Sequence, residues 1–189
     1  VRSTYDSREV RFIRRQEEME AELQQAEGTY IIILAAGTTV ITPEWIEELL
    51  MFTQREDVGM TGMQIVDEHG AIISSDLVNG TTPDRLGIEV NEGEHYDATG
   101  YMGRNYYAHN VSAVSGWACM LKKDTLEKLW KKDYTRTLMG RMMEICFALR
   151  LDGKQIVLDP YALVEIPKGE QPDRLSASDR TLLMEHYRE

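Results

Sequence analysis

The sequence predicts an α/β domain whose second half is more irregular than its first. The run at 30–34, YIIIL, is β-branched and uninterrupted, which indicates a central strand buried on both faces. A segment with a broad apolar stripe at helical spacing follows at 45–52. Of the 189 residues, 42% are hydrophobic and 28% are charged, the balance of a globular domain with enough apolar material for a core.

Strands and helices are expected to alternate through the first part of the chain. Residues 10–13 are apolar enough for a short strand, and a Glu/Gln-rich helix ended by Gly28 follows. After the central strand, Thr42 is expected to cap the next helix, with Pro43 at its first helical position. A strand at 58–66, a turn and a returning strand then predict a hairpin.

The second part of the chain has a less regular pattern. Residues 79–110 are rich in Gly, Asn, Asp and Tyr without a clean period, and indicate a long irregular connection. The elements expected after it are a strand at 111–121, helices at 124–131 and 138–149, strands at 155–158 and 162–164, and a last helix capped by Ser178.

The net charge of the chain limits the classes of partner that it is expected to bind, and its cysteines indicate a cellular compartment. A formal net charge of -11 repels phosphate backbones and disfavours docking on anionic lipid, so no nucleic-acid partner is expected. Cys119 and Cys146 lie in apolar runs and are interpreted as buried free thiols of a reducing compartment. No apolar run approaches the roughly 20 residues of a membrane span, and no signal peptide is visible. A soluble, cytoplasmic domain is expected.

Four segments, taken in order, resemble a family 2 glycosyltransferase of the GT-A fold. They are GTYIIIL with AAGTTVITPEW at 28–45, and the segments 57–70, 110–124 and 146–161. The resemblance covers roughly residues 8–168, the C-terminal two-thirds of such a domain, and is closest to bacterial rhamnosyltransferase-like enzymes of cell-surface polysaccharides. It implies a GT-A-like (nucleotide-diphospho-sugar transferase) mixed sheet flanked by helices, with the N-terminal part of the fold missing or altered. Residues 1–168 would form this partial domain, and 169–189 a C-terminal extension with a helix.

The carboxylates that this family uses are absent from the matching positions. The family holds Mn²⁺ or Mg²⁺ with acidic residues after the central strand, where this chain has Ala35, Gly37 and Thr39. The family's general base falls on Met142, one residue after Arg141, and the nearest acid is Glu144. Losing a general base alone costs about 10²–10⁴ in rate. We therefore expect no metal cofactor and degenerate catalytic motifs.

Other side chains are candidates for binding or chemistry. Ser115, Gly116, Trp117 and Glu144 are expected at the substrate side, where Trp117 either stacks on a sugar ring or belongs to the core. Asp76 is a weak candidate for a base, either with His95 and Asp97 in a relocated polar site or as a plain loop residue.

Aromatic residues gather late in the irregular connection. The cluster is interpreted as a carbohydrate platform, a partner surface or ordinary loop packing, and comprises Tyr101, Asn105, Tyr106, Tyr107 and His109.

Three hypotheses for function remain open from the sequence. The first is a degenerate glycosyltransferase-like domain of a bacterial glycan-biosynthesis protein, which binds a saccharide or nucleotide-sugar or scaffolds another domain or subunit. The second is an active, metal-independent glycosyltransferase with Glu144 or Asp76 as base and Arg141 facing the diphosphate. The third is a purely structural or oligomerising module.

Overall fold

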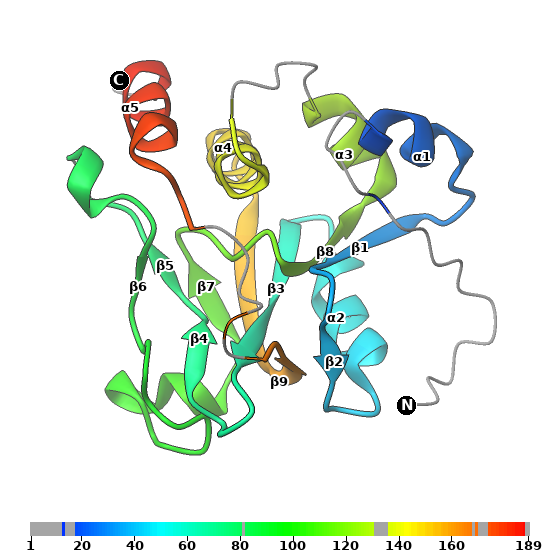
Figure 1. Ribbon diagram of the computed structural model, residues 1–189. Helices are drawn as coiled ribbons and strands as arrows, with labels where there is room; N and C mark the ends of the chain where they lie inside the picture. The colour runs from blue at the N-terminus through cyan, green and yellow to red at the C-terminus, as the bar shows by residue number, and fades with distance from the viewer. Residues whose placement is uncertain are drawn as a thin grey trace.

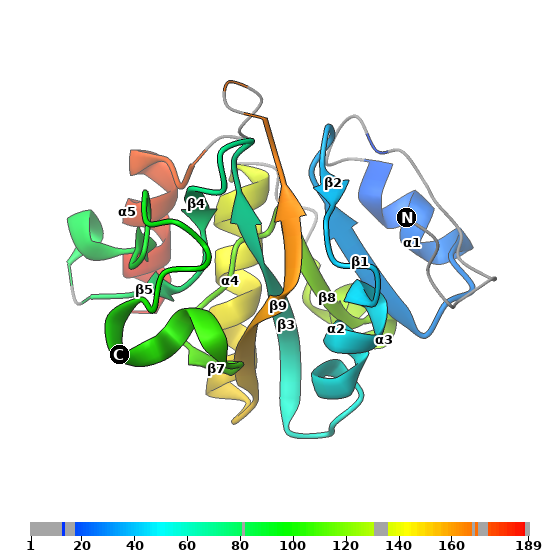
Figure 2. The same cartoon turned by 90° about the horizontal axis from the view of Figure 1, so that it is seen from below.

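The computed structural model describes Ile13 and residues 18–80, 82–130, 136–167, 169 and 174–187. A seven-stranded mixed sheet forms the centre, with α2 on one face and α3 and α4 on the other (Figures 1 and 2). Its strands are β1 (Tyr30–Leu34), β2 (Thr39–Val40), β3 (Val58–Val66), β4 (Ile72–Ser74), β7 (His109–Val111), β8 (Ala118–Lys122) and β9 (Gln155–Glu165). The strands β5 (Leu77–Val78) and β6 (Ile88–Glu89) form a separate pair. The helices are α1 (Met19–Gln25), α2 (Trp45–Thr53), α3 (Lys123–Leu129), α4 (Leu138–Leu151) and α5 (Ala177–His186), with 3₁₀ turns η2 (Pro83–Arg85) and η3 (Tyr101–Tyr106).

The pairing of β3 with β9 lies at the centre of the sheet. The strand order is β1-β8-β3-β9-β2, and β3 and β9 run parallel while β8 is antiparallel to both of its neighbours. Every residue of β3 is buried, as expected for a strand covered by helices on both faces. Because β1 and β3 both pair antiparallel with β8, their C-terminal ends point toward the same edge of the sheet.

β9 is one strand with an irregularity in the middle, where the sequence predicts two strands. Its register with β3 jumps from Met63↔Asp159 to Gln64↔Leu163, so β9 bulges between these pairs. The first half of β9 pairs with β7, and the second half pairs with β2. Tyr161 lies in the bulge and is exposed. The bulge thus changes the neighbour of β9 and turns one aromatic ring to the surface.

Two predicted helix caps are wrong. α2 begins at Trp45, and the Thr42 hydroxyl instead donates to the Tyr161 carbonyl (2.6 Å) and accepts from Leu163 N (3.1 Å). A tertiary contact thus takes the hydroxyl that could have capped the helix. The last helix is capped by Ser176 in a capping box with Asp179, not by Ser178.

The predicted strand at 111–121 is also wrong, because residues 112–117 are not part of a strand. They cross from β7 to β8 between the sheet and α4. A Cβ on Gly62 of β3 would overlap the Val114 side chain, and one on Gly116 would lie 2.6 Å from Cβ of Met142 in α4. The crossing therefore depends on Gly62, which leaves room for it at the sheet, and on its own Gly116, which lets it approach α4.

Several other expectations are confirmed. The hairpin of β3 and β4 turns at Gly70, which has a φ of 79°. Residues 79–110 contain only short elements.

The strand predicted at 10–13 stays a prediction, because residues 10–12 lie outside the described residues and Ile13 has no regular structure. No helix in the described part of the chain combines the length and apolar character that crossing a bilayer requires.

Replacing Gly116 by Ala is expected to lower the free energy of unfolding by about 1–3 kcal/mol, because the new methyl group meets the rigid base of the Met142 side chain. Urea titration of both proteins measures the change. Gly28→Ala is the control, since a Cβ there meets only the Tyr30 carbonyl at 3.3 Å. Equal stability of Gly116→Ala and the wild type would show that α4 does not press on the crossing segment.

Candidate functional site

The loop after β1 occupies the position where the resemblance puts the metal motif. Ala35 N donates to the Trp117 carbonyl (2.7 Å), which ties the loop to the start of β8. The Thr38 hydroxyl donates back to the Ala35 carbonyl (2.7 Å), and Gly37 between them has a φ of 81°. Ala35 is half-buried, while Gly37 and Thr39 are exposed. The loop is a tight turn closed by its own hydrogen bonds, and it carries no carboxylate.

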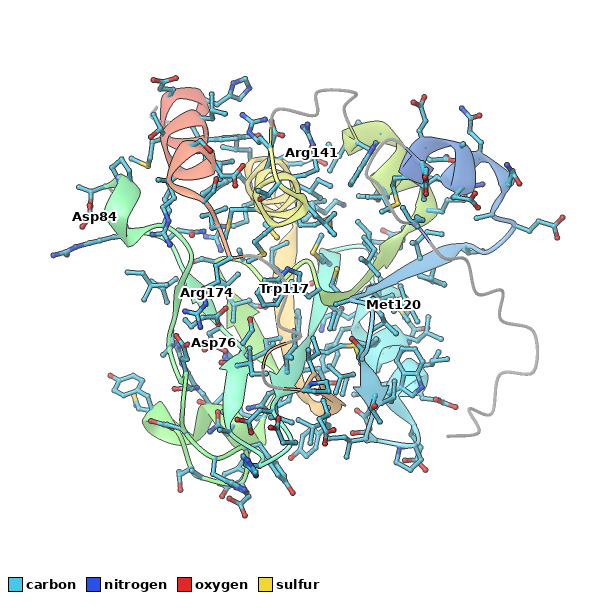
Figure 3. All side chains as sticks on the ribbon, viewed as in Figure 1. Asp76, Asp84, Trp117, Met120, Arg141 and Arg174 are labelled. Carbon is cyan, nitrogen blue, oxygen red and sulfur yellow. The ribbon has the colours of Figure 1, made fainter. Side chains whose placement is uncertain are left out.

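The predicted substrate-side residues Ser115, Gly116 and Trp117 are buried. They lie in the crossing segment beneath α4, and Figure 3 shows Trp117 in the interior of the molecule. The Ser115 hydroxyl accepts from Trp117 N (3.2 Å). Trp117 is a member of the hydrophobic core, so in this conformation its ring face is not available for stacking on a sugar.

Met142, where the resemblance puts the general base, is fully buried. It lies in the first half of α4, whose start is capped by the Thr137 hydroxyl accepting from Gly140 N. The Met142 side chain packs against Gly116 and has no proton-accepting group. This position is therefore part of the core.

Glu144 lies on the same helix, in a buried ionic cluster. One of its oxygens, Oε2, accepts from Arg136 Nη1 and from Arg141 Nη1, each at 2.7 Å. All three side chains are buried. The structure thus brings Arg141 and Glu144 together as structural partners, away from solvent.

Asp76 is the buried centre of a second polar network, beside β7 (Figure 3). Its Oδ2 accepts from Arg104 Nη1 and lies 2.9 Å from His109 Nε2. His109 Nδ1 lies 2.9 Å from the Tyr107 carbonyl. Burial disfavours the protonated form of the His109 ring, but both ring nitrogens face acceptors. The hydrogen bonds to Asp76 and to the Tyr107 carbonyl outweigh the burial, so the pKa of His109 is raised. Asp76 and His109 are therefore hydrogen-bond partners in a buried setting.

Sequence reasoning missed Glu89, which lies next to this network. The Ser74 hydroxyl donates to Glu89 Oε1 (2.6 Å) and Ser75 N donates to Oε2 (3.1 Å). Burial raises the pKa of Glu89 to about 7 in spite of these bonds. A carboxyl group with such a pKa suits proton transfer near neutral pH. No local motif marks Glu89, because Ser74 and Ser75 are 14 or more positions away.

The other predicted polar residues separate in space. His95 pairs with Asp97 on an exposed loop, while the side-chain partners of Asp76 are Arg104 and His109. Tyr101, Tyr106 and Tyr107 belong to or directly follow η3 and are exposed. Asn105 is buried and donates to the Ala98 carbonyl. Within the described residues, no group of three or more His, Cys, Asp or Glu side chains could hold a metal ion.

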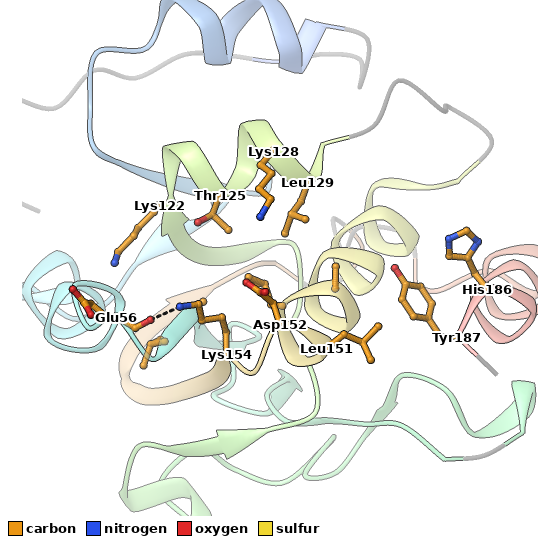
Figure 4. Close-up of a pocket in the computed structure, with 14 residues that line it drawn as sticks. Glu56, Lys122, Thr125, Lys128, Leu129, Leu151, Asp152, Lys154, His186 and Tyr187 are labelled. Atoms are coloured by element: carbon orange, nitrogen blue, oxygen red, sulfur yellow. Dashed lines mark hydrogen bonds between the residues drawn. The ribbon is translucent and has the colours of Figure 1, made fainter. Parts of the chain in front are cut away.

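A cavity of about 650 Å³ opens at the other end of the sheet, where Lys122 of β8 pairs with Tyr30 at the start of β1 (Figure 4). Three ammonium groups line it, those of Lys122, Lys128 and Lys154, together with the carboxylate of Glu56. Two of the lysines bond to backbone carbonyls, Lys122 to Arg55 and Lys154 to Glu56. The volume is that of a small-molecule site, but the cavity is remote from the loop after β1.

Replacing Glu144 by Ala is expected to lower the free energy of unfolding by about 3 kcal/mol or more, because two buried guanidinium groups lose their shared carboxylate. Denaturant titration gives the value. Glu185→Ala, an exposed substitution on α5, should change stability by less than about 0.5 kcal/mol. Similar small effects for both variants would be incompatible with a structural role for Glu144.

The stability of the protein is expected to fall as the pH rises from about 4.5 to about 7, in part through Glu89. Its folded-state pKa of about 7 exceeds the ordinary value of 4.5, so the folded state binds the proton more tightly, and ionisation favours unfolding. Glu89→Gln stays neutral and should show a smaller difference in melting temperature between pH 5 and pH 8. Glu185→Gln is the matched control. An unchanged pH dependence in Glu89→Gln would contradict the raised pKa.

No model of a known protein family matches the chain. Two bacterial proteins are similar to it in sequence. The chain is 25% identical over 144 residues to the uncharacterised protein y4gI of Sinorhizobium fredii, and 24% identical over 134 residues to the O-antigen biosynthesis protein RfbC of Myxococcus xanthus. These matches cover 75% and 71% of this chain but only 16% and 10% of the relatives.

The fold is similar to that of a solved glycosyltransferase. The crystal structure of GalNAc-T7 with UDP, GalNAc and Mn²⁺ superposes with a TM-score of 0.59, at 14% identity, over 90% of this chain and 34% of that chain. The expected fold class is thereby confirmed. The chain has a GT-A-like glycosyltransferase fold, with a mixed sheet flanked by helices.

Proposed function

We propose that this chain is a glycosyltransferase-like domain of a bacterial polysaccharide-biosynthesis protein, without metal-dependent transfer activity, and that it binds a saccharide or scaffolds a catalytic neighbour. One observation carries the proposal. The GT-A-like fold surrounds the two positions where the family resemblance puts its carboxylates, and these hold the tight turn at Gly37 and the buried Met142.

The chemistry of glycosyl transfer supports this reading. A departing diphosphate develops negative charge that a divalent metal neutralises, and the metal needs carboxylate ligands. The acceptor hydroxyl must also lose a proton to a base within hydrogen-bond reach. A glycine in a tight turn and a methionine in the core supply neither group. Similarity to an O-antigen biosynthesis protein favours glycan assembly as the setting, and we place this function in the cytoplasm.

A metal-independent glycosyltransferase is the second candidate, and the network of Asp76, His109 and Glu89 favours it. These groups include a carboxyl group with a pKa of about 7 and an imidazole with a raised pKa beside a buried carboxylate. In this candidate Glu89 or Asp76 would act as the base. Glu144 and Arg141 are less suitable, because each is engaged by the other inside the core. A purely structural module is the third candidate, and it predicts no ligand.

Calorimetric titration with UDP-, GDP- and dTDP-sugars, with and without Mn²⁺, tests the proposal. We expect no binding that depends on Mn²⁺ and no release of the nucleoside diphosphate. Manganese-dependent binding would refute the proposal. Metal-independent turnover that Glu89→Gln or Asp76→Asn abolishes would establish the second candidate, and Glu185→Gln, an exposed substitution on α5, serves as the control.

A further inference from the structure

Exposed aromatic rings gather at one place on this molecule. Among the described residues, five tyrosines are exposed, by the following fractions: Tyr96 40%, Tyr101 64%, Tyr106 48%, Tyr107 45% and Tyr161 55%. All but Tyr96 belong to η3, follow it directly, or bond to it from the bulge of β9. We call Tyr101, Tyr106, Tyr107 and Tyr161 the tyrosine surface.

Hydrogen bonds hold three of these four rings in place. Tyr161 donates its hydroxyl to the Tyr106 carbonyl (2.7 Å), Tyr107 donates to the Met102 carbonyl (3.0 Å), and Tyr106 donates to the Asp97 carbonyl. Each hydroxyl is therefore engaged by backbone while much of its ring stays in solvent. Rings fixed in this way offer contact area at a low cost in conformational entropy.

The backbone under the surface is strained. Within the described residues, Met102 is the one non-glycine residue with a positive φ, 55°, and Gly103 follows with a φ of 81°. Such a conformation is disfavoured for a side chain like that of Met and persists where the surroundings enforce it, often at binding sites. The two residues break η3 into two parts, with Tyr101 before the break and Tyr106 after it.

The tyrosine surface adjoins the loop after β1. Thr42 follows β2, the strand at which that loop ends, and donates its hydroxyl to the carbonyl of Tyr161. On the other side, the Arg104 guanidinium lies over the Tyr101 ring at 5.8 Å and bonds to Asp76. Figure 1 shows η3, the bend of β9 and β2 along the lower part of the molecule. The rings thus lie between the loop and the polar network of Asp76.

These features suit a sugar chain. A pyranose presents a C–H face that packs on an aromatic ring, and hydroxyl groups around its edge that bond to polar side chains. The tyrosine surface offers half-exposed ring faces with the polar groups of Arg104 and Asn110 nearby in the chain. On η3 itself the one aliphatic side chain is that of Met102, so the surface lacks the aliphatic core of a stable protein interface.

We propose that the tyrosine surface is a saccharide-binding site that receives consecutive sugar rings of a bacterial surface polysaccharide. The inference rests on the proposed function and names the site through which the saccharide is bound.

Binding is tested on the full chain carrying ¹³C-labelled tyrosine rings. A microarray of bacterial surface polysaccharides selects the probe, which is then titrated while the ring signals are recorded by NMR. We expect the signals of the tyrosine surface to shift, while those of Tyr30 and Tyr187, which line the opposite end of the sheet, remain unchanged.

Substitutions then locate the contact. Tyr106→Ala and Tyr161→Ala are each expected to weaken binding by about tenfold or more. Tyr106→Phe keeps the ring and loses only the bond to Asp97, so it should bind within about threefold of the wild type. Leu151→Ala removes an exposed apolar side chain elsewhere and should leave affinity unchanged. Circular dichroism confirms that each variant is folded.

The possible results distinguish failure of the tyrosine surface as the binding site from failure of the proposed saccharide-binding function. Binding by the wild type that survives both alanine substitutions, or shifts confined to Tyr30 and Tyr187, would overturn the tyrosine surface as the site and leave the proposed function standing. Failure of every polysaccharide to bind would overturn the saccharide-binding function itself. If the alanine variants lose a protein partner that the wild type binds, and no glycan binds either protein, the surface is a protein interface and the inference is overturned.

Discussion

The parallel pairing of β3 and β9 is the contact on which the rest of this structure depends. Buried β3 presents one edge to β8 and the other to β9, and all of the sheet is assembled on these two edges. The bulge in β9 lets a single strand serve two neighbours, β7 before it and β2 after it. Since β2 ends the loop after β1, the same irregularity positions that loop. It also turns Tyr161 outward to meet η3.

Close packing around the crossing segment explains why Met142 is buried in the core. The segment runs between the sheet and α4, with Gly62 on one side and Met142 against Gly116 on the other. A carboxylate at position 142 would have to be buried in this apolar layer without a partner, which is costly. Methionine satisfies the packing, and the helix keeps its charged groups, Arg141 and Glu144, in a closed cluster. The replacement is thus consistent with its surroundings.

Polar groups gather beside β7. The network of Asp76, Arg104 and His109 joins β7 and η3 to the segment after β4, and Glu89 lies beside it. The tyrosine surface borders this network through Arg104 and the loop after β1 through Thr42. A fold alone does not determine function. What distinguishes this chain is the combination of a loop without carboxylates, a charged network and a fixed aromatic surface.

The sequence by itself determined the fold class and most elements, because buried strands and amphipathic helices leave local patterns at 30–34, 58–66 and 138–149. The absence of carboxylates at 35–39 and at 142 is likewise read from the sequence alone, since residue identity needs no coordinates. The tertiary structure alone decided which distant groups meet. Thr42 bonds to Tyr161, 119 positions away, in place of capping a helix, and Asp76 meets His109 in place of His95. Such pairings depend on sheet register and on the bulge in β9, which no local period encodes. For the same reason a group of neighbouring tyrosines in the sequence became a surface only when β9 added a fourth ring from another part of the chain.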